Sequence, residues 1–239
     1  MTPDPTAGAV IFDCDGVLVD SEIIAIEVEV AALTAVGISL TPAGLAERYV
    51  GVSAAAQVAA VHEEFGVVLD EAWWAALAAD SERALAQRVR AIPGIRAVVE
   101  GVPGPYALAS SSSHPRIELC LRTAGLLDLF GDDVRFSATD VRRGKPAPDL
   151  FLHAASSLGI AANECVVVED SPYGVRAALA AGMHVIGFTG GGHADQRWAA
   201  RLRQAGAGLV VASAEELAAA LGVGPAGPPH QPARRTRCR

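Results

Sequence analysis

Two aspartates near the start of the chain have a spacing that suits phosphoryl transfer. Asp13 directly follows the apolar residues 10–12, Asp15 comes two residues later, and Gly16 follows it. One carboxylate can attack phosphorus while the second handles the proton of the leaving group. A glycine lets the backbone turn sharply out of a strand. The pattern therefore predicts reactive side chains at the end of a first strand.

A single lysine is the second unusual feature. The chain contains 19 lysine and arginine residues, of which only Lys145, in Gly144-Lys145-Pro146, is a lysine. A compact ammonium group and a planar guanidinium are not interchangeable beside a phosphate. Lys145 is therefore a candidate for binding a phosphoryl group.

Polar or acidic residues end two further apolar runs. Ser110 ends residues 106–110, and Glu169 and Asp170 end the run that begins at Cys165. In an open parallel sheet, ligands bind beyond the carboxyl ends of the strands, so we expect these side chains to gather there.

The gathered side chains form a candidate site for a divalent cation and a phosphate. Four carboxylates in one cleft need a counter-charge, which Mg²⁺ can supply because it takes carboxylates, waters and phosphate oxygens as ligands. The remaining phosphate oxygens would be held by Lys145, Ser110 and backbone N–H groups near Gly16 and Ser111. The candidate metal ligands are Asp13, Asp15, Glu169 and Asp170.

Apolar runs alternate with helical stretches along most of the chain. Continuous apolar strands separated by helices are typical of a parallel sheet covered on both faces. We therefore expect an α/β fold with a doubly wound, Rossmann-like core. The predicted strands cover residues 10–12, 106–110, 134–137, 165–169, 184–188 and 209–211.

One long interval contains no convincing strand. We predict that residues 23–91 form an all-helical cap domain inserted after the first strand, while residues 1–22 and 92–222 form the core. Residues 223–239 are rich in Gly, Pro and Arg and are predicted to be a disordered tail. The predicted helices of the cap interval are 22–36, 42–49, 53–65 and 70–90.

The charge balance argues against nucleic acid as a partner. The chain carries a net charge of −8, and four of its last six residues are arginine, so residues 1–233 carry −12. Binding to a duplex rests on cationic contacts to phosphates, which so acidic a body does not offer. A small phosphorylated metabolite is the expected partner, and we expect a monomer or weak homo-oligomer.

Other classes of protein are disfavoured by what the sequence lacks. No apolar run approaches the ~18 residues of a membrane helix, so no membrane association is expected. Residues 1–8 lack the basic and apolar regions of a signal peptide, which makes a cytoplasmic location the expectation. The four cysteines contain no Cys-x-x-Cys pair, so neither a zinc site nor a disulfide framework is indicated.

Taken together, the motifs resemble those of the haloacid dehalogenase (HAD) superfamily, in its phosphatase and β-phosphoglucomutase-like branch. That branch carries four motifs, and this chain matches them in the same order. The resemblance covers nearly the whole chain up to about residue 221. The matching segments are Asp13-Cys14-Asp15-Gly16, Ser110, Lys145 and Glu169-Asp170.

The resemblance implies a mechanism through an aspartyl-phosphate. Asp13 would be the nucleophile, and Asp15 would protonate the leaving group and then activate water. The Asp13 and Asp170 carboxylates and the Asp15 backbone carbonyl would bind Mg²⁺, with Glu169 binding directly or through water. The helical cap would close over the site and select the substrate.

The resemblance also separates branches of the family. Asp15 argues against the dehalogenases, and the absence of lysine from residues 23–91 argues against phosphonate cleavage. The mutase branch places a His and an Arg in the cap where this chain has Ala25 and Ala54. We therefore expect Mg²⁺-dependent hydrolysis of a small phosphomonoester, similar to a sugar or polyol phosphate. A β-phosphoglucomutase-like mutase and a catalytically idle phospho-ligand or partner-binding protein are the alternatives.

Several residues keep two interpretations. Ser110 begins a run of four serines, so the register of the phosphate-binding hydroxyl is open by one residue. His114 either contacts the substrate or starts a helix, and His193 lies either near the site or in solvent. Asp20 is expected to cap the first helix of the cap interval.

Overall fold

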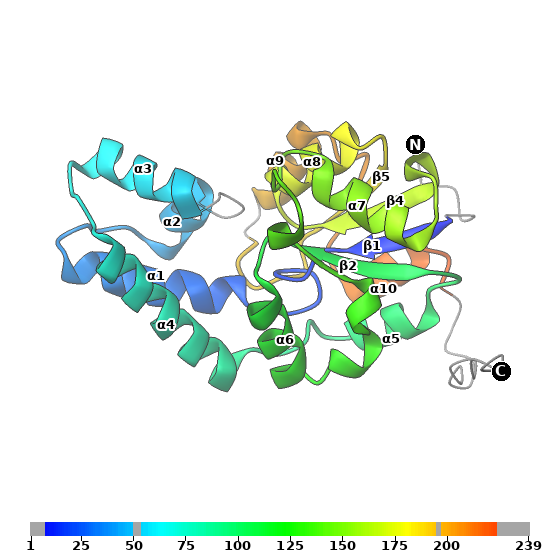
Figure 1. The fold of residues 1–239 in the computed structure, drawn as a ribbon, viewed down its shortest axis with the longest axis horizontal. Helices are drawn as coiled ribbons and strands as arrows, with labels where there is room; N and C mark the ends of the chain where they lie inside the picture. The colour runs from blue at the N-terminus through cyan, green and yellow to red at the C-terminus, as the bar shows by residue number, and fades with distance from the viewer. Residues whose placement is uncertain (1–7, 50–53, 195–196, 224–239) are drawn as a thin grey trace.

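A parallel sheet of six strands forms the centre of the molecule (Figure 1). The structure is a computed structural model, and it describes residues 8–49, 54–194 and 197–223. The strand order is β3-β2-β1-β4-β5-β6, which confirms the expected doubly wound α/β fold. The strands are β1 (Ala9–Phe12), β2 (Tyr106–Ser110), β3 (Arg135–Ser137), β4 (Cys165–Glu169), β5 (His184–Phe188) and β6 (Leu209–Val211).

Helices cover both faces of this sheet because successive side chains of its strands point to opposite sides. In β1, Ala9 and Ile11 join one buried cluster, whereas Val10 and Phe12 join the other. In Figure 1, α7, α8 and α9 lie on one side of the sheet and α5, α6 and α10 on the other. These helices are α5 (Ile95–Gly101), α6 (His114–Thr123), α7 (Asp149–Leu158), α8 (Pro172–Ala180), α9 (Trp198–Ala205) and α10 (Ala214–Ala220).

Short 3-10 turns complete the connections between these elements. They are η1 (Leu127–Leu129), η2 (Asp132–Val134), η3 (Ala138–Asp140) and η4 (Ala162–Glu164).

Four helices follow β1 and extend to one side of the sheet, on the left in Figure 1. Thr41 starts the second of them by accepting a hydrogen bond at its hydroxyl oxygen from the Gly44 N–H, at 3.0 Å. Asp70 accepts in the same way from the Trp73 N–H at the start of the fourth. The helices are α1 (Glu22–Ala35), α2 (Pro42–Tyr49), α3 (Ala54–Phe65) and α4 (Glu71–Arg88).

The chain leaves the core and returns to it at neighbouring points. The Asp20 N–H donates to the Arg90 carbonyl at 2.9 Å, and Val19 and Ala91 form an antiparallel bridge. The helical segment α1–α4 is thus attached through two adjacent strands of chain. Its status as a separate domain stays a prediction, and residues 224–239 of the predicted tail lie outside the described residues.

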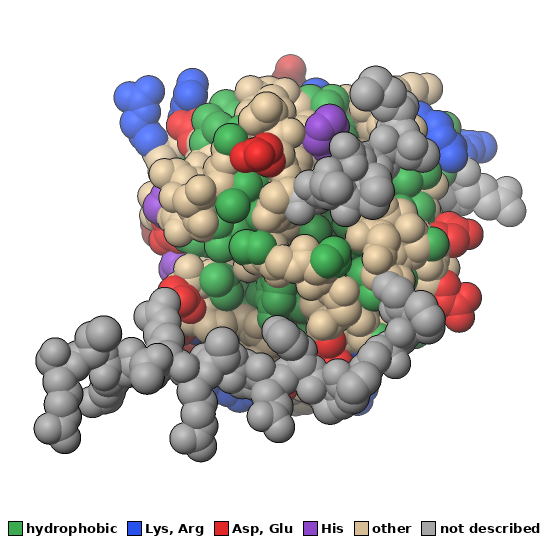
Figure 2. All heavy atoms as spheres, turned by 90° about the vertical axis from the view of Figure 1, so that its right-hand side faces the viewer, with side chains coloured by type: hydrophobic (Ala, Val, Ile, Leu, Met, Phe, Trp, Pro, Cys, Tyr) green, Lys and Arg blue, Asp and Glu red, His purple; other side chains and the backbone are tan. Residues whose placement is uncertain are grey.

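Among the described helices, none is long and apolar enough to cross a membrane. Figure 2 shows the face remote from α1–α4, where hydrophobic and polar side chains are interspersed and the visible Lys and Arg side chains lie near the margins.

Candidate active site

The point at which the strand order reverses brings the first acidic motif next to the last. β1 pairs with β4 on one side and with β2 on the other, so all three strands end at the same edge. Asp13 follows β1, and its N–H continues the pairing by donating to the Val168 carbonyl at 2.9 Å. Crevices at such a reversal are the usual ligand sites of open α/β sheets.

Lys145 joins the two acidic motifs. Its Nζ donates to Asp13 Oδ1 and to Glu169 Oε1, each at 2.6 Å, and to the Ala109 carbonyl oxygen at 3.1 Å. The side chain is only 3% exposed. Burial opposes its charge, but Asp13 and Glu169 together raise the Lys145 pKa above its ordinary value, so the ammonium stays charged.

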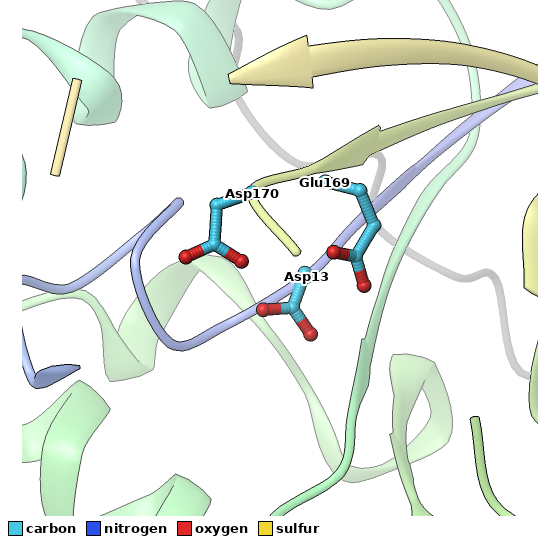
Figure 3. A group of neighbouring side chains, drawn as sticks. All are labelled: Asp13, Glu169 and Asp170. Carbon is cyan, nitrogen blue, oxygen red and sulfur yellow. The ribbon is translucent and has the colours of Figure 1, made fainter. Parts of the chain in front are cut away.

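Asp13, Glu169 and Asp170 form a buried carboxylate cluster (Figure 3). Each residue offers an oxygen, and these oxygens lie within 4.8 Å of one another. Burial raises the pKa of Asp13 and of Asp170 well above the ordinary value, and the neighbouring carboxylates raise both further. A second positive charge beside Lys145 would relieve this repulsion.

The start of α8 is shaped around Glu169. Its Oε2 accepts hydrogen bonds from the Ser171 N–H at 2.9 Å and the Ser171 hydroxyl at 3.0 Å. Ser171 also caps α8 by accepting from the Gly174 N–H, as its position before Pro172 predicts. A Cβ at Gly174 would lie 1.7 Å from Glu169 Oε1, so a residue with a side chain here would displace the carboxylate.

Gly16 makes equivalent room for Asp170. Its φ of +80° belongs to the left-handed region, which glycine adopts without steric cost. A Cβ at this position would stand 1.9 Å from Asp170 Oδ2. Gly16 thus permits the turn predicted from the sequence, and it also permits the close approach of Asp170 from the end of the neighbouring strand.

Asp15 is held by three hydroxyl groups. Oδ1 accepts from Ser21 at 2.6 Å, and Oδ2 accepts from Ser112 at 2.8 Å and from Ser110 at 3.2 Å. These bonds fix the carboxyl group in the cavity lining, two residues after Asp13.

A cavity of about 510 Å³ opens over these groups. One wall comes from the strand ends and the other from α1, α2, α3 and α4. Its lining includes Asp13, Asp15, Ser111, Lys145, Glu169 and Asp170.

Two predicted substrate contacts are placed differently. Ser110 is fully buried, and its hydroxyl bonds to Asp15, while Ser111 and Ser112 line the cavity. His114 starts α6, and its Nε2 lies 2.8 Å from Asp140 Oδ1. The structure does not bring it to the cavity, because the bond to Asp140 directs the ring elsewhere.

Asp20 and His193 also differ from their simplest sequence interpretations. Ser21, not Asp20, precedes α1 as its N-cap residue, and Asp20 accepts instead from the Gly192 N–H at 2.9 Å. His193 is buried, so its interpretation as a solvent residue is wrong. Its Nε2 lies 3.1 Å from Asp170 Oδ2 without hydrogen-bond geometry, and its ring meets Trp198 edge-on.

The three carboxylates fit a hard divalent cation. Oxygen donors on rigid strand ends are the ligands that Mg²⁺ takes in proteins. Asp170 Oδ2 is buried and has no hydrogen-bond partner in the described structure, which leaves a lone pair for a metal ion. The chemistry of the donor set therefore agrees with the expected Mg²⁺.

Comparison with known proteins agrees with this geometry. A family model for haloacid dehalogenase-like hydrolases matches residues 7–182. The chain belongs to this family. The hydrolase is 32% identical to the 6-phosphogluconate phosphatase of Escherichia coli (strain K12) over 186 residues, which cover 77% of this chain and 84% of the relative.

Solved structures of the same family share the fold of this hydrolase. A haloacid dehalogenase-like protein of unknown function from Agrobacterium tumefaciens str. C58 is 37% identical, with a TM-score of 0.83 over 90% of this chain and 97% of the other. A putative β-phosphoglucomutase from Thermotoga maritima is 29% identical, with a TM-score of 0.67 over 90% and 97%. The hydrolase is thus a HAD-like phosphatase with β-phosphoglucomutase-like structural neighbours.

Proposed function

We propose that the protein hydrolyses a small phosphomonoester of the sugar or polyol type through an aspartyl-phosphate on Asp13, with Mg²⁺ as cofactor. The observation that carries this proposal is that Asp13 and Asp15 line one cavity, with Lys145 hydrogen-bonded to Asp13. The name of the 6-phosphogluconate phosphatase relative supports a phosphorylated sugar as the substrate class.

The proposed reaction has two displacements at phosphorus. A carboxylate oxygen of Asp13 bonds to phosphorus as the bond to the leaving oxygen breaks, and Asp15 gives that oxygen a proton. Asp15 then takes a proton from water as the water oxygen attacks phosphorus and frees Asp13. The three hydroxyls around Asp15 hold it in position for both proton transfers.

Charge compensation is shared between the protein and the cofactor. Asp13, Glu169 and Asp170, with the Asp15 carbonyl, would hold Mg²⁺, which supplies positive charge against the phosphoryl oxygens when bound. Lys145 keeps its proton and binds the phosphoryl group, while Ser111 at the cavity wall offers a further donor.

A phosphosugar mutase is the enzymatic alternative. Such an enzyme must hold a bisphosphate intermediate, which needs cationic groups on the wall opposite the nucleophile. Ala25 lies on that wall, where the mutase branch has a histidine. Ala54 starts α3, and its side chain lies outside the described residues. These residues favour hydrolysis over transfer.

The decisive test measures phosphate release from a panel of phosphomonoesters with and without Mg²⁺, while the isomerisation of β-glucose 1-phosphate is followed in parallel. We expect Mg²⁺-dependent release from sugar or polyol phosphates and no isomerisation. Isomerisation without net release would establish the mutase, and silence in both assays would leave a binding protein.

Removal of the nucleophile provides the matching genetic test. Asp13→Asn should lower kcat about a thousandfold or more while the circular dichroism spectrum is unchanged. Asp149→Asn, at a half-buried carboxylate that pairs with Arg143, is the control and should keep full activity. Activity retained by the Asp13 variant would refute the proposed role of Asp13.

A further inference from the structure

One face of α1 runs outward along the cavity from the catalytic groups. Glu22, Ala25, Ile26 and Glu29 line the cavity, and their spacing places them on one side of the helix. Seven residues along a helix correspond to about 10 Å, so the two glutamates stand at different depths.

The surroundings of the two glutamates show which is nearer the catalytic groups. Burial, together with the charges of Asp15 and Asp170, raises the pKa of Glu22 to about 7. Burial also raises the pKa of Glu29 to about 7, but the only other influence is the hydrogen bond from Gln57, which lowers it. Ser21, directly before α1, donates to Asp15 at 2.6 Å, so the start of the helix lies beside the catalytic groups and Glu29, two turns later, lies in the outer part of the cavity.

The lining of the whole cavity carries few positive charges. Among the described lining residues, Lys145 and Arg116 face six carboxyl groups. Lys145 is bonded to Asp13 and Glu169, and the attraction of Asp15 and Glu22 raises the Arg116 pKa although burial opposes it.

We propose that Glu29 and Gln57 recognise the end of the substrate remote from the phosphate, and that this end is an uncharged hydroxyl-bearing chain, as in a hexitol phosphate. The proposal rests on the proposed function and narrows its substrate class. A sugar acid phosphate or a bisphosphate would place a second negative charge beside Glu29.

The chemistry of the pair supports this assignment. The Gln57 side-chain amide donates to Glu29 Oε1, which orients both groups across the cavity from α3 to α1. A carboxylate and an amide carbonyl can each accept a hydrogen bond from a hydroxyl group. A second carboxylate has no hydrogen to donate, so it meets only repulsion from Glu29. Trp74 and Ser81 of α4 also line the cavity.

A matched pair of substrates tests the inference. D-Glucitol 6-phosphate and 6-phosphogluconate share one carbon skeleton and differ at C1, which is a hydroxymethyl group in the first and a carboxylate in the second. With the full chain and saturating Mg²⁺ at pH 8, where Glu29 is mostly charged, kcat/KM should favour glucitol 6-phosphate about tenfold or more.

Variants assign that preference to Glu29. Glu29→Gln keeps the side-chain size and removes the charge, so the preference should shrink severalfold, mainly through a lower KM for 6-phosphogluconate. Glu63→Gln, an exposed glutamate on α3, should leave the preference unchanged. The KM readout separates a recognition role from a general loss of folded enzyme.

The outcomes separate this inference from the proposed function on which it rests. Hydrolysis of p-nitrophenyl phosphate shows that the phosphatase is active. If the active enzyme prefers 6-phosphogluconate, hydrolyses neither member of the pair, or keeps its preference in Glu29→Gln, the inference alone is overturned. No Mg²⁺-dependent hydrolysis of any ester overturns both.

Discussion

At the residue scale, glycines that leave room for catalytic side chains are as important to the site as those side chains themselves. The approach of Asp170 to the backbone at Gly16 leaves no space for a Cβ atom. The same glycine has a positive φ, so a substitution would carry two costs, backbone strain and collision. These costs can be separated because Gly37 also has a positive φ, of +87°, but has open space around it.

Gly16→Ala and Gly37→Ala should therefore differ in which property they change. Gly37→Ala should lower the free energy of unfolding by about 1 kcal/mol, the cost of the left-handed conformation, and leave catalysis unchanged. Gly16→Ala should also weaken Mg²⁺ activation about tenfold or more, because it displaces Asp170. Urea unfolding and Mg²⁺ titration of phosphatase activity measure the two effects. Equal Mg²⁺ dependence in both variants would contradict the steric role of Gly16.

The site residues that could be predicted from the sequence are those whose type is unusual for their position. Asp13, Asp15, Lys145 and the Glu169-Asp170 pair could be predicted because acids and a lone lysine at strand ends have few structural uses. His193 could not be assigned, because its burial depends on how a glycine-rich loop folds over Asp170 and against Trp198. Such loop contacts leave no periodic pattern in the sequence.

At the scale of elements, α1 links the core to the cavity wall. Its inner face carries Glu29, whose pKa is raised from 4.5 to about 7 by burial. The folded protein therefore binds a proton on this group more tightly than the unfolded chain does. The contribution of Glu29 to the stability of the folded protein falls as the pH rises from about 4.5 to about 7. Above that range, the buried charge of Glu29 continues to lower the stability.

Glu29→Gln should raise the melting temperature more at pH 8 than at pH 5. The charge that costs stability is present mainly at the higher pH, where the substitution by glutamine removes it. The expected rise in melting temperature is a few degrees at most because Glu29 is half-buried. Thermal unfolding of both proteins at the two pH values measures the difference, with Glu63→Gln as a variant that should show none. A gain of the same size at both pH values would contradict the titration of Glu29.

The strands and helices were easier to predict than the directions of their side chains. Continuous apolar runs such as 165–169 can only be buried strands between two helix layers, and every predicted strand is present within one residue. By contrast, sequence could not show that Ser110 turns toward Asp15 or that His114 turns toward Asp140. Those directions depend on hydrogen bonds between segments far apart in the chain.

At the scale of the whole molecule, the carboxylate cluster is a source of instability that a cation would relieve. Asp13 and Asp170 have raised pKa values, first because of burial and then because of like charges around them. A ligand that binds only the folded state stabilises it by mass action, by about 2.7 kcal/mol at a concentration of one hundred times its Kd.

Mg²⁺ should accordingly raise the melting temperature by a few degrees, and removal of the metal with EDTA should reverse the rise. Asp170→Asn should be more stable than the parent without metal and should lose the Mg²⁺-dependent rise, whereas Asp149→Asn should keep it. Differential scanning calorimetry gives both quantities. A rise retained by Asp170→Asn would remove Asp170 from the metal site.

The adjacent crossings at Asp20–Arg90 and Val19–Ala91 have a consequence for how the protein can change over evolution. Because both ends of the helical segment meet at one point, its exchange for another helical segment needs no rearrangement of the sheet. The reaction chemistry stays with strand ends that the exchange does not touch, while the wall carrying Glu29 and Gln57 is replaced as a unit. New substrates can thus be acquired by modular replacement, without rebuilding the catalytic groups.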